Sequence, residues 1–407
     1  MKIVHLSLED SFGAGRAALR INRAVNKAGV DSAVYVLNKS EMADSYAINL
    51  SRAERLKNMV YDRMNHMLLN KYEEHGYFHV DRYGIDFMKN PVVAEADILH
   101  FHWINEGIWS RKFVKSLIKT QKPIVWTMHD MWTFTGGCHY DEFCGNYKKQ
   151  CVNCKVLGNG QNCKDALKAQ KRKKEYLEKL NIQLVGCSQW ITEQANESTI
   201  GKSTKRKAVC VPNPTNDECF KIYDKDLCRQ LLGIKSEKKL VLFGAVNAVS
   251  DQRKGAHYII EALKTLDPEK YILGVFGNKT VNLGLDAFEV NNFGRINDDF
   301  HLSFIYNAAD VFVAPSMQEN LANTVMESLT CGTPVTAFSI GGMPDMIIHE
   351  QNGYLAEAFD VQDLARGIQV AAELSKNPQK IRNTILERFS EKKIGQLYSQ
   401  LYGEVLK

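Results

Sequence analysis

Short apolar runs alternate with amphipathic segments along most of the chain. The runs are rich in Val, Ile, Leu and Phe and are bounded by turn residues, as buried strands are. Strands are predicted in the first half at 2–8, 33–37, 98–102, 124–128 and 183–186. In the second half they are predicted at 239–243, 271–276, 290–293, 310–314 and 334–338. Amphipathic segments between them, such as 16–27 and 257–266, are predicted crossover helices, so the pattern indicates an α/β fold with parallel sheets.

The chain length predicts more than one domain. A chain of 407 residues is too long for one ordinary core. Pro212 and Pro214 restrict the backbone between the two sets of strands. We therefore expect an N-terminal domain over 1–211, a second domain over 212–378 and a C-terminal helix over 379–407.

The most informative polar pattern lies where the strand at 310–314 leads into a helix predicted at about 320–330. The apolar positions of this helix repeat every four residues, at Leu321, Val325 and Leu329. Its polar stripe is formed by Asn320, Asn323 and Glu327, and Glu319 lies just before it. Free N–H groups of the first turn, from Asn320 through Leu321 and Ala322 to Asn323, are expected to form an anion site at the carboxyl end of the strand.

The Glu-x7-Glu spacing of Glu319 and Glu327 resembles the donor site of the retaining glycosyltransferases of family 4. The strand before it and the sequence 331–342 after it, with Gly341-Gly342, strengthen the resemblance, which covers nearly the whole chain. It implies the GT-B fold, two Rossmann-like doubly wound domains facing each other across a cleft, with the last helix crossing back onto the first domain. It also implies that Glu319 contacts the donor sugar and Glu327 the nucleotide ribose. The alternative is that Glu319 complements a helix dipole and Glu327 is solvated surface.

Cations for the donor phosphates are expected at Arg253-Lys254-Gly255, before the helix at 257–266. A leaving nucleoside diphosphate develops negative charge, so cations beside it lower the barrier. The resemblance assigns a lysine and an arginine to this work. Lys254 matches the lysine, but the usual place of the arginine, after the strand-end Gly244, holds Ala245. Arg253 is the candidate substitute, and a solvated helix start is the alternative for both cations.

Two glycines, Gly13 and Gly15, follow the first strand and open a helix. Glycine lets the backbone approach a ligand, and a helix start attracts anions. The resemblance implies paired glycines here, but Phe12 occupies the first place. Gly13 and Gly15 are therefore the expected donor contacts, with a simple tight turn as the alternative.

Histidines mark the ends of two first-half strands. His129 follows the strand at 124–128 and matches a family histidine that contacts the donor sugar near the reacting carbon. His102, which shares one strand face with His100, and Asp130 are expected on the acceptor side. A satisfied buried histidine is the alternative for His100 and His102, and a turn cap is the alternative for Asp130.

Ten cysteines are present, and five of them fall between Cys138 and Cys163. Cys138, Cys144, Cys151 and Cys154, ending in Cys-x-x-Cys, suit tetrahedral zinc, with free thiols as the alternative. Cys163 could replace any one of them. Only some members of the family carry this loop, including enzymes of exopolysaccharide assembly such as colanic acid synthesis. Such a zinc would be structural and shape the acceptor side, because GT-B catalysis requires no metal cofactor.

Composition narrows the setting of the protein. No run approaches 18 apolar residues, and the apolar run at the start is too short for a signal peptide, so a cytoplasmic location is expected. The formal charge of +5 does not by itself imply nucleic acid. Basic residues gather at 164–179 and 202–207, which is compatible with peripheral contact with an anionic membrane at the inner face of the cell membrane. A solvated helix face and a charged loop are the simpler interpretation.

These patterns predict a retaining transferase of bacterial surface polysaccharide synthesis. It would move a sugar from a nucleotide-diphosphate sugar to a glycan or lipid-linked acceptor. One alternative is a catalytically silent GT-B scaffold, acting as a nucleotide-sugar sensor or assembly subunit. Another is a nucleic-acid-binding zinc module, which the mild charge of the Cys loop opposes. Asp224-Lys225-Asp226 spells the Asp-x-Asp of metal-dependent transferases, but no buried strand leads into it, so a helix start is expected there.

Overall fold

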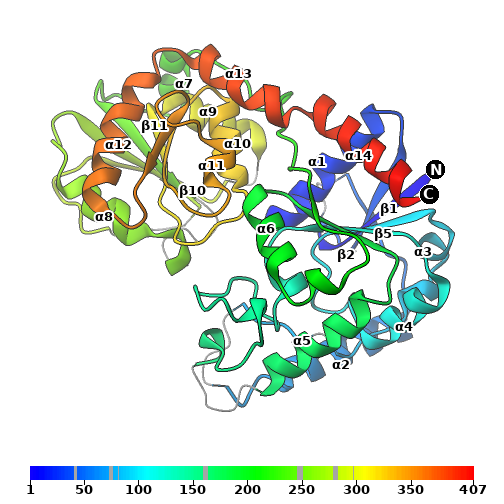
Figure 1. Cartoon of the computed structure of the whole chain (residues 1–407). Coiled ribbons are helices and arrows are strands. Elements are labelled where there is room, and N and C mark those ends of the chain that lie inside the picture. Colours follow the sequence, from blue (N-terminus) through cyan, green and yellow to red (C-terminus); the bar gives the residue numbers. More distant parts are fainter. Residues whose placement is uncertain are drawn as a thin grey trace. The chain divides into compact units, whose positions relative to one another are not determined.

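The computed structural model describes residues 1–40, 44–72, 77–80, 82–158, 164–244, 251–277, 283–296 and 298–407. The chain forms two compact units (Figure 1). The first comprises Met1–Pro214 and Ile394–Lys407, and the second comprises Thr215–Lys393. No helix of the described residues is long and apolar enough to cross a membrane.

The first unit is built on a seven-stranded sheet in the order β3-β2-β1-β4-β5-β6-β7, and all of its strand pairs are parallel. Its strands are β1 (Lys2–Glu9), β2 (Asp31–Asn38), β3 (Tyr46–Ala47), β4 (Ile98–Phe101), β5 (Ile124–Met128), β6 (Ile182–Gly186) and β7 (Val209–Cys210). Strands β4, β5 and β6 are buried along their whole length, which explains their continuous apolar sequences. The two-residue strands β3 and β7 were not predicted because they are too short to show a pattern.

Seven helices surround this sheet in the described part of the first unit. They are α1 (Gly13–Lys27), α2 (Arg52–Met67), α3 (Pro91–Glu95), α4 (Arg111–Thr120), α5 (Lys164–Leu177), α6 (Gln189–Glu197) and most of α14 (Glu391–Val405). The C-terminal helix α14 runs beside α1 (Figure 1), and its Tyr398 and Tyr402 share a core cluster with Ile21 and Val25. A Cβ on Gly395 would lie 2.2 Å from the carbonyl oxygen of Ala24, so the two helices approach closely.

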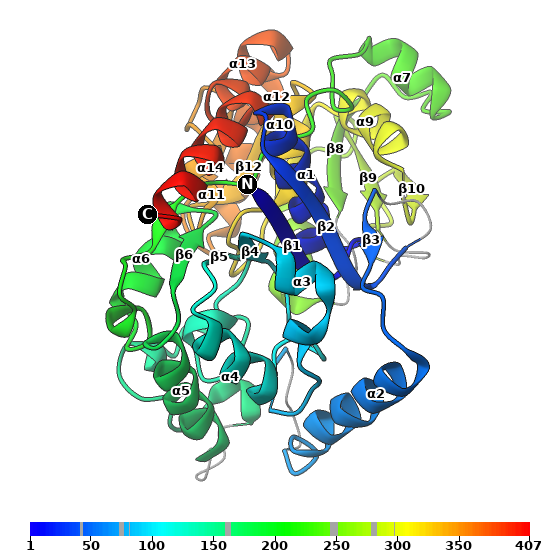
Figure 2. The ribbon, with the colours of Figure 1, turned by 90° about the vertical axis from the view of Figure 1, so that its right-hand side faces the viewer.

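The second unit carries a six-stranded parallel sheet in the order β10-β9-β8-β11-β12-β13. Its strands are β8 (Lys239–Gly244), β9 (Tyr271–Phe276), β10 (Val290–Gly294), β11 (Val311–Ala314), β12 (Val335–Phe338) and β13 (Gly353–Ala356). Its helices are α7 (Lys225–Leu231), α8 (Ala256–Lys264), α9 (Asp299–Ala308), α10 (Asn323–Thr330), α11 (Met343–Met346), α12 (Val361–Leu374) and α13 (Pro378–Phe389). Val311 and Val313 join the core cluster formed with α8 and α12, whereas Phe312 points to the opposite face and contacts Tyr306 of α9. Figure 2 shows α9 close to β9 of this sheet.

These two units confirm the predicted fold class, an α/β protein with two parallel-sheet domains. The helix start predicted at Asp224 is also confirmed, because Asp224 caps α7 and its side chain accepts from the N–H of Leu227. The single helix predicted over 379–407 is wrong. Two helices occupy this segment, and Ser390 between them is extended, with φ −62° and ψ 147°, so the helical hydrogen bonds are interrupted there.

Candidate functional site

A buried carboxylate and two cations meet at the carboxyl edge of the second unit's sheet. Glu319 follows β11, while Arg253 and Lys254 belong to a short 3-10 helix, η6 (Gln252–Lys254), after β8. Oε2 of Glu319 accepts from Nζ of Lys254 at 2.5 Å and from Nη1 of Arg253 at 3.3 Å. Burial alone would raise the pKa of this carboxyl, but Lys254 and Arg253 outweigh burial and hold the pKa at about 2. Glu319 is therefore ionised.

The backbone around η6 fixes the position of Lys254. Gly255 adopts a left-handed conformation, with φ +71°, and a Cβ there would lie 1.9 Å from the carbonyl oxygen of Pro315. Only glycine permits both the dihedral angle and the close approach. The N–H of Met317 also donates to the carbonyl oxygen of Arg253 at 2.8 Å. These contacts join the loop after β11 to the turn after β8, so Lys254 and Glu319 are placed by backbone packing.

Helix α10 starts later than predicted. It begins at Asn323 with Ala322 as its N-cap, whereas the sequence placed its start at about 320. Ala322 is extended, with ψ 114°, and Asn320 is fully buried, so this segment is packed into the unit before the helix starts. The expected anion site shifts accordingly from Leu321 to the first turn at Asn323 and Thr324. A surface pocket at this edge is lined by Gly244, Lys254, Ser316, Glu319, Ala322 and Thr324, among others.

Glu327 lies on the same helix but is not on its solvated face. Its side chain is 2% exposed, and its Oε2 accepts from the hydroxyl of Tyr306 at 3.3 Å. The alternative that Glu327 is solvated surface is therefore wrong. Its role toward a ribose stays a prediction. The solvated-start alternative for Lys254 and Arg253 is also wrong, because their side chains are only 20% and 23% exposed and are ion-paired. Ala245 lies outside the described residues.

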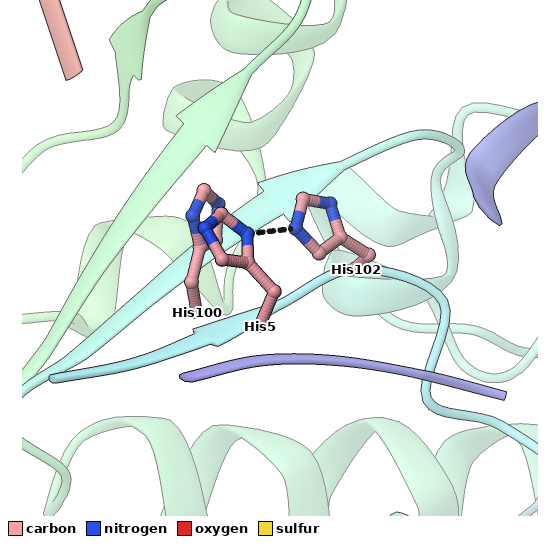
Figure 3. Close-up of side chains that lie close together, drawn as sticks. All are labelled: His5, His100 and His102. Atoms are coloured by element: carbon pink, nitrogen blue, oxygen red, sulfur yellow. Dashed lines mark hydrogen bonds between the residues drawn. The ribbon is translucent and has the colours of Figure 1, made fainter. Parts of the chain in front are cut away.

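In the first unit, three histidines form a row. Nε2 of His129 lies 3.0 Å from Nδ1 of His102. On the other side, Nε2 of His102 lies 2.9 Å from Nδ1 of His5, a contact drawn as a dashed line in Figure 3. The centroids of the two ring pairs are 5.3 and 5.2 Å apart with interplanar angles of 23° and 14°. In each pair, the distance between the ring centroids is longer than the N···N distance by about the width of one imidazole ring. The two rings of a pair therefore meet end to end, nitrogen to nitrogen, as hydrogen-bonded rings do.

His100 packs against this row and completes a group with His5 and His102. The ligand atoms of these three all lie within 4.8 Å of one another, the one such group found among the residues that the structure describes. Both ring nitrogens of His100 are already bonded, to Tyr402 at 2.7 Å and to Thr127 at 2.8 Å. A metal would have to displace these bonds and bend the collinear His5–His102 contact. The geometry is that of a hydrogen-bonded core, which confirms the satisfied-histidine alternative for His100.

Burial keeps these rings neutral. It lowers the pKa of His5 to about 3 and that of His129 to about 4, and the pKa of His102 lies well below its usual value for the same reason. His102 is 3% exposed and both its nitrogens contact other histidines, so it does not itself line a pocket. It touches His129 and can act on a ligand only through that ring.

Asp130 caps the turn that follows β5. Its Oδ1 accepts from the N–H of Trp132 at 2.8 Å, so the turn-cap alternative is confirmed. Its Oδ2 accepts from Nε1 of Trp103 at 3.1 Å and lies 2.6 Å from Nδ1 of His139. Burial would raise the pKa of Asp130, but His139 and these hydrogen bonds lower it below its usual value.

A second, separate row of polar contacts begins at Asp130 and His139 and runs through residues that the sequence did not single out. Nε2 of His139 lies 2.7 Å from Nδ1 of His79, and Nε2 of His79 lies 2.7 Å from Oε1 of Glu106. The hydrogen bond from His79 lowers the pKa of Glu106. Two imidazoles thus join two carboxylates near the expected acceptor side. His79 and Glu106 lie in segments without a strand or helix pattern, so no sequence signal pointed to them.

The two glycines of the first turn have different environments. Gly15 is buried, and a Cβ there would lie 2.3 Å from the carbonyl oxygen of Glu9, so its small size is explained by the packing of α1 on β1. Gly13 is exposed and is the first residue of α1. A ligand can therefore reach Gly13 from solvent. The donor contact predicted for Gly13 and Gly15 stays a prediction.

The four cysteines of the loop line one pocket. Cys138, Cys151 and Cys154 are buried and Cys144 is half-buried, and all four border it with Phe78 and Tyr147. In the part of the loop that the structure describes, no three of their sulfur atoms all lie within 4.8 Å of one another. Burial raises the pKa of Cys138 well above its usual value and that of Cys151 to about 12, so the thiols are protonated in this arrangement. Cys163 lies outside the described residues.

Comparisons with known proteins fit this architecture. Residues 224–388 match the family described as Glycosyl transferases group 1. The chain is 29% identical over 259 residues to the putative colanic acid biosynthesis glycosyl transferase WcaC of Escherichia coli (strain K12), covering 61% of this chain and 60% of that protein. It is 28% identical over 200 residues to an uncharacterized glycosyltransferase of Methanocaldococcus jannaschii, covering 43% of this chain and 50% of that protein. The chain thus spans about half to three fifths of these relatives.

Solved structures share the fold at low sequence identity. Sucrose-phosphate synthase from Thermosynechococcus elongatus has a TM-score of 0.65 at 18% identity, covering 99% of this chain and 98% of that one. Anabaena HepE in complex with UDP-glucose has a TM-score of 0.63 at 16% identity, covering 99% and 100%. The protein therefore has the GT-B fold. The residues that match the family description, 224–388, lie within its second unit.

Proposed function

We propose that this protein is a retaining glycosyltransferase of bacterial surface polysaccharide synthesis, working on the cytoplasmic side. It would transfer a sugar from a nucleotide-diphosphate sugar to a glycan or lipid-linked acceptor. The observation that carries the proposal is the ionised, buried Glu319 between Lys254 and Arg253, beside the first turn of α10. A carboxylate can accept hydrogen bonds from sugar hydroxyls, while cations and the N–H groups of a helix's first turn suit phosphates.

In the proposed donor complex, the phosphates lie against Lys254 and the N–H groups of Asn323 and Thr324. Glu319 orients the sugar, and Glu327 accepts from the ribose hydroxyls. The pocket residues already border one space at the sheet edge, which supports this assignment. Because Glu319 and Lys254 are paired without the donor, both are held in place before binding, and little rearrangement is required.

The proposed chemistry is departure and attack on the same face of the sugar. Lys254 and Arg253 stabilise the negative charge that develops on the leaving phosphate. That phosphate takes the proton of the acceptor hydroxyl as the acceptor oxygen bonds to the sugar. Because the attack comes from the face that the phosphate leaves, the anomeric configuration is retained without a carboxylate nucleophile. His129, neutral because of its burial, would contact the donor sugar as a hydrogen-bonding group rather than as a cation. Gly13 and Gly15 would approach the donor from the start of α1, and Asp130 would help to shape the acceptor side.

A nucleotide-sugar panel tests this proposal. Purified protein is incubated with each donor, beginning with UDP-glucose, and release of the nucleoside diphosphate is measured with and without candidate acceptors. The product is then analysed by NMR for its anomeric configuration. An inverted product would refute the retaining mechanism. Tight nucleotide binding with no turnover across donors and acceptors would favour the silent scaffold instead.

We also propose one structural zinc in the Cys loop, held by Cys138, Cys144, Cys151 and Cys154. The support is that all four side chains border one pocket, and four thiolates suit tetrahedral zinc. Binding would require the thiols to lose protons and the sulfurs to move closer together. No catalytic step depends on this metal. Elemental analysis of protein purified without chelator should give one zinc per chain. Cys151→Ser should lower that content, whereas Cys210→Ser, a change outside the loop, should not.

A further inference from the structure

Helix α2 has its polar side inward and its apolar side outward. The residues it buries are Asn58 and Asn65. Its large apolar side chains are exposed: Leu56 at 65%, Met59 at 69%, Val60 at 52%, Met64 at 37% and Met67 at 61%. At 100° per residue these five side chains occupy an arc of about 140°, and the two asparagines lie opposite its centre. An ordinary surface helix is oriented the other way.

Specific hydrogen bonds fix this rotation of the helix. Oδ1 of Asn65 accepts from the N–H groups of Arg82 at 3.0 Å and Tyr83 at 2.9 Å, and its Nδ2 donates to the carbonyl oxygen of Tyr83 at 2.9 Å. At the other end, Ser51 and Glu54 form a capping box. Turning the apolar face inward would break the three bonds of Asn65, so the outward orientation belongs to the folded state.

The charges around the apolar arc have one dominant sign. The exposed basic residues of α2 are Arg52, Arg55, Lys57 and Arg63. At 100° per residue, Arg52 and Arg63 fall within the arc, and Arg55 and Lys57 border it on either side. The acids Glu54 and Asp62 are half-buried and lie toward the asparagine side. The exposed face of α2 is therefore apolar, with basic residues within it and along its rim.

We infer that the exposed face of α2 docks onto an anionic lipid bilayer. The five apolar side chains would enter the boundary between headgroups and acyl chains, and the arginines and lysine would contact lipid phosphates. A helix of 16 residues is about 24 Å long, which suits a helix lying in the membrane plane rather than crossing it. The inference does not depend on the donor site, although a lipid-linked acceptor would be available at the same surface.

Charge favours lipid over a second copy of the chain. Two α2 faces brought together would place their basic rims against each other, and like charges in contact are unfavourable. The basic segments at 164–179 and 202–207 fit a membrane less well. In α5, Lys173 is buried and donates to the carbonyl oxygen of Trp132, and in the second segment Arg206 donates to Asn181. Neither segment shows a stripe of exposed apolar side chains like that of α2.

Vesicle flotation tests the inference without nucleotide or acceptor. The full-length protein should float with vesicles of phosphatidylglycerol and phosphatidylcholine, float much less with phosphatidylcholine alone, and lose binding as salt increases. In one variant, Leu56→Gln is combined with Met59→Gln. In the control, Leu227→Gln is combined with Leu231→Gln on α7, where these leucines are 52% and 63% exposed. Each α2 substitution should weaken partition about tenfold or more, because a leucine-sized side chain gains that much on burial.

The control pair should bind vesicles within twofold of the parent protein. Because all four substituted side chains are exposed, thermal unfolding should be unchanged, which separates loss of docking from misfolding. A second variant, Lys57→Glu with Arg63→Glu, should lose binding to anionic vesicles while its apolar face is intact. Three results would overturn the inference. The first is that the Leu56→Gln, Met59→Gln variant binds vesicles as well as the parent protein does, and the second is that the parent protein binds neutral vesicles as well as anionic ones. The third is that the parent protein forms a concentration-dependent dimer that the same two substitutions abolish. Nucleotide binding measured in parallel reports on the donor site independently.

Discussion

Replacing Glu319 by glutamine is the sharpest test of the donor site, because it removes the charge and little of the volume. In the native protein this carboxylate contacts Lys254 at 2.5 Å and Arg253 at 3.3 Å and is 7% exposed. Glutamine can still offer an oxygen to either cation but is neutral. The variant therefore separates the charge of Glu319 from its packing.

The stability change follows from the pKa of Glu319. A pKa of about 2 in place of 4.5 corresponds to about 3 kcal/mol of stability at neutral pH. Since Lys254 and Arg253 are 20% and 23% exposed, water can solvate them in the variant, and we expect a net loss of about 1–3 kcal/mol. The folded-state pKa is depressed, so this contribution is complete above about pH 4.5 and is lost as the pH falls toward 2. The unfolding free energies of parent and variant should therefore differ by a constant amount from pH 7 to 5 and converge below that.

The catalytic change should be larger than the stability change can explain. A hydrogen bond from a sugar hydroxyl to a charged acceptor is worth about 1.5–3 kcal/mol, which corresponds to a loss of about 10- to 150-fold in kcat/KM. If Glu319 orients the sugar for reaction, most of this loss will appear in kcat at saturating donor. The assay measures release of nucleoside diphosphate together with unfolding by denaturant.

Asp310 supplies the matched control in the same unit. Its carboxylate contacts Lys225 and Arg229, each at 2.7 Å, and is 13% exposed, but it lies directly before β11 and does not line the pocket. Asp310→Asn should destabilise the protein by a similar amount and leave kcat within about twofold. A kcat for Glu319→Gln within threefold of the parent would refute the assignment of this residue. Equal losses of kcat in both variants would show that stability alone controls activity.

The remaining predictions concern the other side chains of the two candidate sites. Lys254→Ala should abolish transfer, mainly through kcat, while far-UV circular dichroism stays unchanged; activity within threefold would contradict its role. Glu327→Ala should weaken both nucleoside diphosphate and donor in calorimetry, and unchanged affinities would exclude the ribose contact. Cys151→Ser should reduce acceptor use more strongly than nucleotide binding, whereas an equal loss of both would indicate global misfolding. His102→Phe should free the ring of His129 from its fixed contact, which NMR of the imidazole nitrogens would detect as a changed nitrogen shift, and an unchanged spectrum would contradict the coupling.

Much of the fold could be predicted because parallel strands buried on both faces have continuous apolar sequences. The bounds of β5 and β9 agree with the prediction, and both strands are buried throughout. The missed strands lack that property or length. Strands β3 and β7 contain two residues each, while β13 begins with a glycine and is not buried throughout, because Leu355 is half-buried. The start of α10 was misplaced because Asn320 and Leu321 fit the helical stripe, yet both are buried in the connection before the helix.

The candidate donor site could be predicted in part, because its residues lie at strand ends and in turns. Lys254 and Glu319 are 65 positions apart, and the resemblance to a known donor site, rather than periodicity, placed them together. Periodicity predicted the polar stripe that contains Glu327. It did not predict that this side chain is buried, because its burial depends on the packing of Tyr306 from α9. The histidine row had no sequence signal beyond strand-end positions, because it requires the register of β1, β4 and β5 to bring His5, His102 and His129 into line.

The orientation of helix α2 could not be predicted from the periodicity of its sequence. A 3.6-residue repeat reveals that a helix has an apolar stripe, but the repeat is the same whether that stripe faces a protein core or a lipid surface. The direction of α2 is decided by Asn65, whose partners Arg82 and Tyr83 follow 17 and 18 residues later in the chain. Asn65 is buried and bonded on both its oxygen and its nitrogen, so turning the helix would break these three hydrogen bonds and leave polar groups unpaired in the interior. The polar side of α2 therefore determines its orientation, and its apolar side is left available for a membrane.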